Sequence, residues 1–132
     1  SVSFGVGHSK ASRGDSDVFA VRLSGTTGAP QWLARGGGPG ADQGRAVAVR
    51  PDGRVVVGGY TSANAAFGAA WLANGGTTDG FVAELTAAGD WRWATRVSGS
   101  GADVVNDLAL DGAGNLAADS YNHLPLPPLF RR

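Results

Sequence analysis

The chain has 132 residues and no net formal charge, and 42% of its residues are hydrophobic. This length suffices for one domain with one core, and the balanced charge offers no strong field to attract nucleic acid or an anionic membrane. The chain lacks cysteine, which excludes disulfides and thiolate metal sites, and it has no apolar run near the ~18 residues of a membrane span. We therefore expect no nucleic-acid partner and no membrane span.

Glycine, with 22 residues, has about double its usual share. Together with valine, threonine and tryptophan, and with few helix-forming residues, it favours many short strands joined by tight turns. The predicted strands, in chain order, span residues 18–23, 31–35, 45–49, 54–60, 80–85, 91–97, 105–110 and 115–118. The expected fold class is all-β.

Residues 42–60, DQGRAVAVRPDGRVVVGGY, have the clearest pattern of a β-hairpin. Two apolar runs, 46–49 and 55–57, flank a turn in which Pro51 comes early and Gly53 late, as a tight turn requires. Because neither run alternates with polar residues, we expect both to be buried on both faces.

Residues 61–78 form a longer connection than a hairpin needs. The spacing of Phe67, Trp71 and Leu72 suits a helical turn packed on the edge of a sheet. The aromatic side chains either fill gaps between layers of the fold or form the lip of a ligand site. In the second case the expected contact residues are Trp71, Phe67 and Asn64.

Residues 80–97 show the alternation of strands with two unlike faces. In FVAEL, residues 81–85, the first, third and fifth side chains share one face, whereas Val82 and Glu84 share the other. In WRWATRV, residues 91–97, the odd positions are mostly apolar and the even positions carry the arginines. Such a charged face suits the outer strand of a sheet.

The chain repeats itself with a period of 61 or 62 residues. The segment DVFAVRL at 17–23 matches DGFVAEL at 79–85, and residues 42–60 return in weaker form at 103–121. Each period supplies four short strands, which is the pattern of one β-propeller blade of antiparallel strands. The repeat divides the chain into a half blade (1–36), a full blade (42–97), a half blade (103–120) and a proline-rich tail (121–132).

Several segments follow one consensus: 79–85, Trp93, Asp103 and 108–116, together with Gly58-Gly59-Tyr60-Thr61-Ser62. In this pattern they resemble the bacterial β-propeller repeat family known as SBBP. That family has a D-x-F-V-A-K-L segment, a Gly and a Trp, a Gly-Gly pair, an Asp and then I-A-V-D-x-x-G-N-x-Y-V-x-G-x-T. The resemblance implies a propeller in a secreted or cell-surface bacterial protein.

The end of the chain is similar to the NHL propeller repeat, whose name spells the Asn122-His123-Leu124 found here. The family continues there with a third strand. Pro125, Pro127 and Pro128 argue against a central strand in this chain, because proline cannot donate to a ladder. We expect a tail that departs from the repeat.

About two blades are encoded, whereas propellers close with about four to eight. A lone pair of blades would expose apolar faces and open strand edges. Two solutions are open: the chain is a piece of a longer one that supplies the remaining blades, or several copies form a ring. In a ring, the C-terminal half blade of one copy pairs with the N-terminal half blade of the next. Three copies would give about six blades and four copies about eight.

Few residues suggest chemistry. His8 and His123 are the only imidazoles and lie far apart in sequence, and no run of acids has EF-hand spacing. Calcium held by Asp111, Asn115 or Asp103 is the sharper alternative to a simple turn role for these residues. We expect no enzyme, no catalytic residue, no cofactor and no metal.

The sequence therefore favours a non-catalytic module for structure or for binding a protein or other ligand. The alternative is a lectin-like propeller that binds carbohydrate through the aromatic residues of the 61–78 connection. Its contact residues would again be Trp71, Phe67 and Asn64.

Overall fold

The computed structural model describes residues 1–75, 77–97 and 102–120. Within these ranges no residue lies in a helix, and every ladder between named strands is antiparallel, which confirms the all-β prediction. In this part of the chain there is accordingly no helix long and apolar enough to cross a membrane. The proline-rich tail and His123 lie outside the described residues.

The strands follow one another along the whole described chain. They are β1 (Val2–Ser3), β2 (Ser9–Lys10), β3 (Val18–Leu23), β4 (Pro30–Gly36), β5 (Asp42–Val49), β6 (Val55–Thr61), β7 (Ala65–Phe67), β8 (Ala70–Leu72), β9 (Asp79–Leu85), β10 (Trp91–Val97), β11 (Val105–Leu110) and β12 (Leu116–Ser120). The eight strands predicted from the sequence correspond to β3–β6 and β9–β12.

A four-stranded sheet occupies the centre of the protein, with its strands β5, β6, β9 and β10 side by side in chain order. The turn from β5 to β6 closes where Gly53 adopts a φ of 90°, a left-handed conformation that glycine adopts without strain. The inner strands β6 and β9 are buried almost throughout, on both faces. The sheet therefore needs a covering layer on each side.

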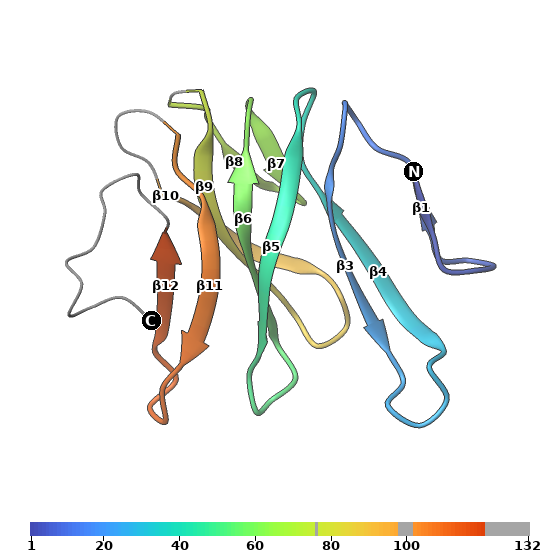
Figure 1. The fold of residues 1–132 in the computed structure, drawn as a ribbon. Helices are drawn as coiled ribbons and strands as arrows, with labels where there is room; N and C mark the ends of the chain where they lie inside the picture. The colour runs from blue at the N-terminus through green and yellow to red at the C-terminus, as the bar shows by residue number, and fades with distance from the viewer. Residues whose placement is uncertain (76, 98–101, 121–132) are drawn as a thin grey trace, which may run out of the picture.

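Two smaller sheets provide these layers, and Figure 1 shows them on opposite sides of the central sheet. Against one face packs the β3–β4 pair, with Val18 and Ala20 buried against the valines and Leu85 of the central sheet. Against the other face packs the β11–β12 pair, through Val105 and Leu108. The result is a stack of three sheets with two hydrophobic cores.

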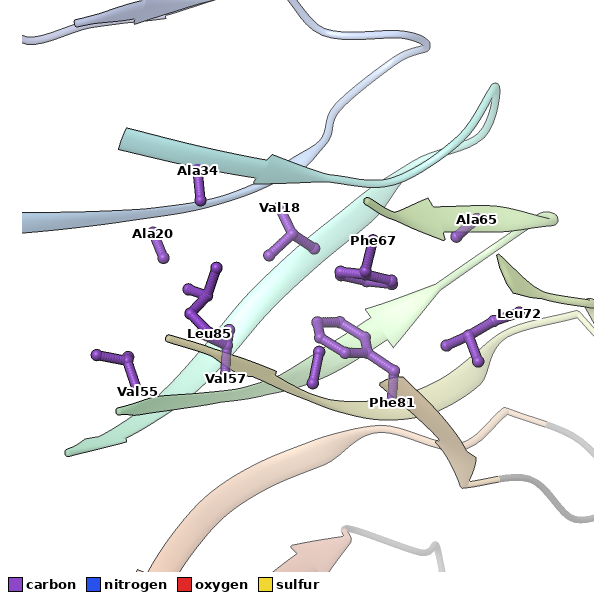
Figure 2. Close-up of a cluster of buried hydrophobic side chains, with 11 residues drawn as sticks. Val18, Ala20, Ala34, Val55, Val57, Ala65, Phe67, Leu72, Phe81 and Leu85 are labelled. Atoms are coloured by element: carbon purple, nitrogen blue, oxygen red, sulfur yellow. The ribbon is translucent and has the colours of Figure 1, made fainter. Parts of the chain in front are cut away.

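The 61–78 connection is a second β-hairpin, β7–β8, and the predicted helical turn is wrong. Phe67 ends β7 with its ring fully buried, 4.7 Å from the ring of Phe81 and 5.0 Å from that of Trp91 between centroids. Figure 2 shows the ring of Phe67 lying over that of Phe81, tilted relative to it, within the first core. The aromatic spacing that suggested a helix instead anchors a hairpin to the sheet below it.

The sequence repeat is also a repeat of strand pairing. In β5–β6, Val49 faces Val55, and in β11–β12 Leu110 faces Leu116, which is the same pair moved by 61 residues. Both ladders are interrupted at the same place, between Gly44 and Ala46 in the first and between Val105 and Asp107 in the second. The two hairpins therefore share one register, including its irregularity.

The other two strand pairs repeat in the same way. Phe19 faces Arg35 across β3–β4, and Phe81 faces Arg96 across β9–β10. Each ladder again shifts at one place. In β3–β4 the shift lies between the pairs Arg22–Trp32 and Leu23–Pro30. In β9–β10 it lies at the corresponding position, between the pairs Glu84–Trp93 and Leu85–Trp91. The β3–β4 pair thus corresponds to the second half of the central sheet, and β11–β12 corresponds to its first half.

Candidate functional site

A groove of about 880 Å³ lies between β3 and the β5–β6 hairpin. Phe19 and Leu23 of β3 and Val47 and Val49 of β5 line it, with exposures between 46% and 65%. These large apolar side chains are exposed near the edge of β3, and folded proteins seldom leave several such side chains uncovered in one region. The predicted burial on both faces is confirmed for β6 but is wrong for β5, whose outward valines have no cover here.

The groove exists because β3 has a ladder on one edge only. Its partner β4 pairs on one side, and no strand of the described chain pairs on the other. In the central sheet the corresponding strand, β9, has β10 on one edge and β6 on the other, from the pair Val55–Leu85 to the pair Thr61–Asp79. The free edge of β3 therefore presents unpaired backbone N–H and C=O groups beside the apolar side chains.

Two arginines, Arg22 and Arg45, and two aspartates, Asp17 and Asp42, line the groove. Arg22 of β3 reaches across to the β5–β6 turn, where its Nη1 donates to the carbonyl oxygen of Gly53 at 3.1 Å. Arg45 of β5 also lines the groove and lies with its guanidinium 5.6 Å from the ring centre of Tyr60. Both arginine side chains therefore lie along the groove, next to the edge of β3.

The equivalent position in the central sheet has the opposite charge. Glu84 corresponds to Arg22 and is 1% exposed. It accepts hydrogen bonds from Arg50 Nε at 2.9 Å and Arg54 Nη1 at 3.2 Å, and it also pairs with Arg92. Here a buried acid on the third strand is matched by basic residues of the hairpin that pairs with that strand.

Two carboxylates close one end of the groove. Asp42 accepts from the backbone N–H of Gly38 at 2.8 Å and of Ser62 at 3.4 Å. Burial raises the pKa of Asp42, with a smaller upward contribution from the charge of Asp17. Asp17 pairs with Arg35 at 3.7 Å, and its Oδ1 has no hydrogen-bond partner among the described residues.

These acids serve the same architectural purpose in each repeat. Asp79, the counterpart of Asp17, lies 3.9 Å from Arg96 and accepts the backbone N–H of Gly75. Asp42 itself begins β5, and its N–H donates to Ser16. Because the bonds that the structure gives the Asp42 carboxylate come from backbone amides, this carboxylate fixes the chain where β5 begins.

Of the three residues predicted to contact a ligand, the structure exposes two and buries one. Trp71 of β8 is 63% exposed, and Asn64 lies at the surface, where its Oδ1 accepts the N–H of Asn74 at 2.8 Å. Phe67 is fully buried between Phe81 and Trp91 and offers no surface to a ligand. Phe67 is therefore corrected to a core residue.

The remaining tryptophans belong to the packing between sheets. Trp32 and Trp91 are partly buried against the first core, and Trp93 against the second. The indole Nε1 of Trp32 donates to Ala87 at 3.0 Å and that of Trp91 to Arg35 at 2.9 Å. Both bonds join one sheet to the next.

Asp111 is arranged as a turn acceptor. Its carboxylate accepts the backbone N–H groups of Ala113 and Asn115 and the side-chain amide of Asn115, all at 2.8–2.9 Å. The side-chain bond from Asn115 and these backbone bonds hold the pKa of Asp111 below its usual value. Donors of this kind compete with a cation for the same oxygens.

Of the two histidines, His8 lies within the described residues. His8 lies in the turn between β1 and β2, with its Nδ1 3.2 Å from the carbonyl oxygen of Val6. Residues 1–75, 77–97 and 102–120 contain no group of three or more His, Cys, Asp or Glu side chains that could hold a metal ion.

Sequence reasoning missed the groove, although its signal was present. The match of Arg22 with Glu84 is an exchange of charge within an otherwise similar segment, VFAVRL against GFVAEL. That exchange becomes meaningful only when the strand that pairs with each residue is known. No family model matches the chain, and no curated protein matches it.

Proposed function

We propose that this chain is a non-catalytic β-propeller repeat module of the SBBP type, which acts by packing its sheets against further blades. In this proposal the central sheet is one complete blade. The β3–β4 pair is the outer half of the preceding blade, and the β11–β12 pair is the inner half of the following one. The module serves as a structural or binding element of a secreted or cell-surface protein, a location that rests on the family resemblance.

The observation that carries the proposal is the repetition of both ladders with their irregularities. Two hairpins share one register at a spacing of 61 residues, and two outer strand pairs share another. Aromatic packing repeats as well: Phe4 lies 5.9 Å from Phe19, as Phe67 lies 4.7 Å from Phe81. Units that cannot bury their own faces and are repeated in this way are stabilised by their neighbours.

The function of the groove follows from the same correspondence. In the central sheet, the inner hairpin β5–β6 pairs with the edge of β9. At β3 the equivalent hairpin is missing from the described chain, and its place is the groove lined by Val47 and Val49. The module is thus complete only when an inner hairpin fills that place.

The experiment supplies this hairpin within one chain. A second copy of residues 102–120 is joined ahead of Ser1 by a short flexible linker. We expect slower hydrogen exchange at the β3 amides and a higher midpoint of urea unfolding, because the hairpin pairs with the free edge and covers the valines. A matched chain carries the same added segment with its residues in scrambled order.

Equal exchange rates and equal midpoints in the two chains would contradict the proposal. The measurement does not depend on whether separate copies associate, because the added hairpin is tethered to the groove.

Carbohydrate binding is the second candidate, favoured by the exposed indole of Trp71. An exposed tryptophan offers a stacking surface for a sugar ring, and Asn64 of the same connection is also exposed. Trp71 lies on the opposite strand from Ala66 in a hairpin that is anchored by a buried residue, so its position is fixed. This candidate no longer includes Phe67.

A glycan array tests the candidate. The unchanged protein should bind a subset of glycans, and Trp71→Ala should abolish that binding while the unfolding midpoint changes little. Arg45→Ala, a surface change away from the β7–β8 hairpin, is the matched control. Absence of binding by the unchanged protein, or equal binding by Trp71→Ala, would eliminate the candidate.

A further inference from the structure

We infer that the groove is the docking site for the β11–β12 hairpin of a second copy of this chain, whose β12 strand pairs with the free edge of β3. The inference deepens the proposed function and rests on it, because it names the partner that completes the open blade. Contacts of this kind run from the tail side of one copy to the head side of the next.

We call the predicted contact between β12 of one copy and β3 of the next the joint. Its register follows from the ladder between β6 and β9 in the central sheet. There, Val55 of β6 faces Leu85 of β9, and Val57 faces Ala83. Moved by the repeat spacings, these pairs become Leu116 opposite Leu23 and Ala118 opposite Val21. The predicted joint is therefore an antiparallel ladder in a defined register, with no insertion or shift.

The hairpin cannot fill the groove of its own copy. Figure 1 shows β11–β12 on one side of the central sheet and β3–β4 on the other. The central sheet separates the two, and Arg50 of that sheet holds the β11–β12 turn in place, since its Nη1 donates to the carbonyl oxygen of Gly114 at 2.7 Å. Pairing with β3 therefore requires a second molecule.

Charge identifies this hairpin as the occupant. Glu84 of the third strand pairs with Arg50 and Arg54 of the hairpin beside it. In the joint, Arg22 replaces Glu84, Asp111 replaces Arg50 and Asn115 replaces Arg54. Within one copy, the acid Glu84 of β9 meets bases of β5–β6. Between copies, the base Arg22 of β3 would meet the acid Asp111 of β11–β12. Both contacts are complementary in charge, with the signs exchanged.

The carbonyl contacts of the two arginines agree with this exchange. Arg50 donates to Gly114 in the turn of the following hairpin, and Arg22 donates to Gly53, the counterpart of Gly114. Each arginine thus holds the turn of the following hairpin. Arg50 does so from the end of β5, and Arg22 does so from β3. Arg22 is already placed where Asp111 of the incoming hairpin would meet it.

Shape and overall charge fit as well. In the protein, Gly58 leaves space for Val105, because a Cβ at Gly58 would lie 2.7 Å from Val105 Cγ1. In the joint, Asp119 takes the place of Gly58 and Gly44 takes that of Val105, so a large residue again meets a small one. The residues of β11–β12 include acids and no bases, and Arg22 and Arg45 line the groove. Of the two acids that also line it, Asp17 pairs with Arg35, and Asp42 is buried and accepts from backbone amides.

The joint would bury the surfaces that the single copy leaves open. Leu108, the counterpart of Val47, is 9% exposed because it packs on the central sheet, whereas Val47 is 65% exposed. Docking places the exposed outer face of β11–β12, with Ala109 and Ala117, over Val47 and Val49. Each copy would contribute about two blades, so closure at four to eight blades takes about two to four copies.

The first test is a disulfide between copies, which is simple to interpret because the chain has no cysteine. Val21 and Ala118 are changed to cysteine in one chain, because the predicted register places them opposite each other. Mild oxidation should yield covalent multimers on a non-reducing gel, with masses confirmed by native mass spectrometry. The control carries Val21→Cys with Ala117→Cys, which places the second sulfur on the other face of β12.

The second test exchanges the charges. Arg22→Glu and Asp111→Arg should each weaken self-association at least about tenfold, because each puts like charges into the joint. An equimolar mixture of the two variants should associate again, since the introduced acid then meets the introduced base, as Glu84 meets Arg50. Because Asp111 also holds its own turn, the mixture is repeated with Asn115→Arg in its place.

A failure of Val21→Cys/Ala118→Cys to cross-link more than its control, or of both mixtures to associate better than their components, would overturn the inference. If the protein remains monomeric while the chain with the added hairpin gains stability, the proposed function still stands. The groove is then filled by a hairpin from elsewhere and not by a second copy.

Discussion

Glu84 is the carboxylate around which the charged side chains of the central sheet gather. It is 1% exposed, and three arginines pair with it. Glu84→Gln removes the counter-charge from a cluster in which Arg50 is also mostly buried. We expect a loss of about 2–3 kcal/mol in the free energy of unfolding, below the usual cost of breaking a fully buried pair because Arg54 and Arg92 reach solvent. Urea unfolding measures it.

Asp52→Asn provides the matched control for this change. Asp52 pairs with Arg54 at 2.8 Å, but its side chain is 56% exposed. Solvent screens an exposed ion pair, so Asp52→Asn should alter the free energy of unfolding much less than Glu84→Gln does. Equal losses in Glu84→Gln and Asp52→Asn would show that burial does not increase the contribution of Glu84 to the free energy of unfolding.

Asp42 should impose a pH dependence on stability. Burial raises its pKa above the usual 3.8. Between pH 3.8 and the raised pKa, the folded state therefore holds a proton that the unfolded state has released. Stability from this group is highest below that window and falls as pH rises through it. The stability of the unchanged protein relative to Asp42→Asn should therefore fall as pH rises, as measured by urea midpoints across the acidic range.

Asp111→Asn is the contrasting case. Hydrogen bonds lower the pKa of Asp111, so its contribution is present above pH 3.8 and is lost as pH falls through the lowered value. The difference from the unchanged protein should have the opposite slope. Slopes of the same sign for Asp42→Asn and Asp111→Asn would contradict the assignment of their environments.

At the scale of elements, the β7–β8 hairpin depends on one buried ring. Phe67 is fully buried against Phe81 and Trp91, and Phe67→Ala leaves a cavity in the first core. We expect a loss of about 3–5 kcal/mol in the free energy of unfolding. Trp71→Ala, on the facing strand of the same hairpin, should cost less than about 1 kcal/mol because its side chain is exposed. Urea midpoints compare the two.

A small cost for Phe67→Ala would show that the hairpin is held by other contacts. A large cost for Trp71→Ala would mean that its indole is covered in solution, for example by another copy.

The strands and the turn at Gly53 were predictable because their signals are local. Alternation of side chains, a Pro–Gly turn and a sequence period need only neighbouring residues or aligned copies. The β7–β8 hairpin was not, since its aromatic spacing satisfies a helical turn and a hairpin equally well. The choice was made by Gly36 and Phe81, distant in sequence, which surround the ring of Phe67.

The candidate site was less predictable than the fold. The valines of β5 predict a strand that is buried on both faces. Val47 and Val49 nevertheless line the open groove, because no strand of the described chain covers them. Likewise, the meaning of Arg22 depends on the charge of Glu84 and on the partner strands of both. Such information lies in pairs of residues that are far apart in the chain.

At the scale of the whole molecule, the proposed joint combines covered apolar surface with unlike charges. Arg22 and Arg45 line the groove, and the docking hairpin brings Asp107, Asp111 and Asp119. Asp17 and Asp42 also line the groove, but Asp17 already pairs with Arg35 and Asp42 is buried. Raising the salt from about 0.1 M to 1 M shortens the Debye length from about 10 Å to about 3 Å. We expect a larger dissociation constant for self-association at high salt, measured by sedimentation velocity.

The stability of each separate copy should change less over the same range, because its two cores are apolar and because Glu84 is buried, where salt screens charges less. Association that strengthens steadily with salt would show that the charges do not contribute to the joint.

The opposite charges at Glu84 and Arg22 also decide which neighbours are rejected. If the β5–β6 hairpin of one molecule strayed to the β3 edge of another, Arg50 and Arg54 would meet Arg22. If β11–β12 displaced β5–β6 beside β9, Asp111 would meet Glu84. Two hairpins of nearly identical backbone are thereby prevented from trading places, and strand exchange during folding at high concentration is discouraged.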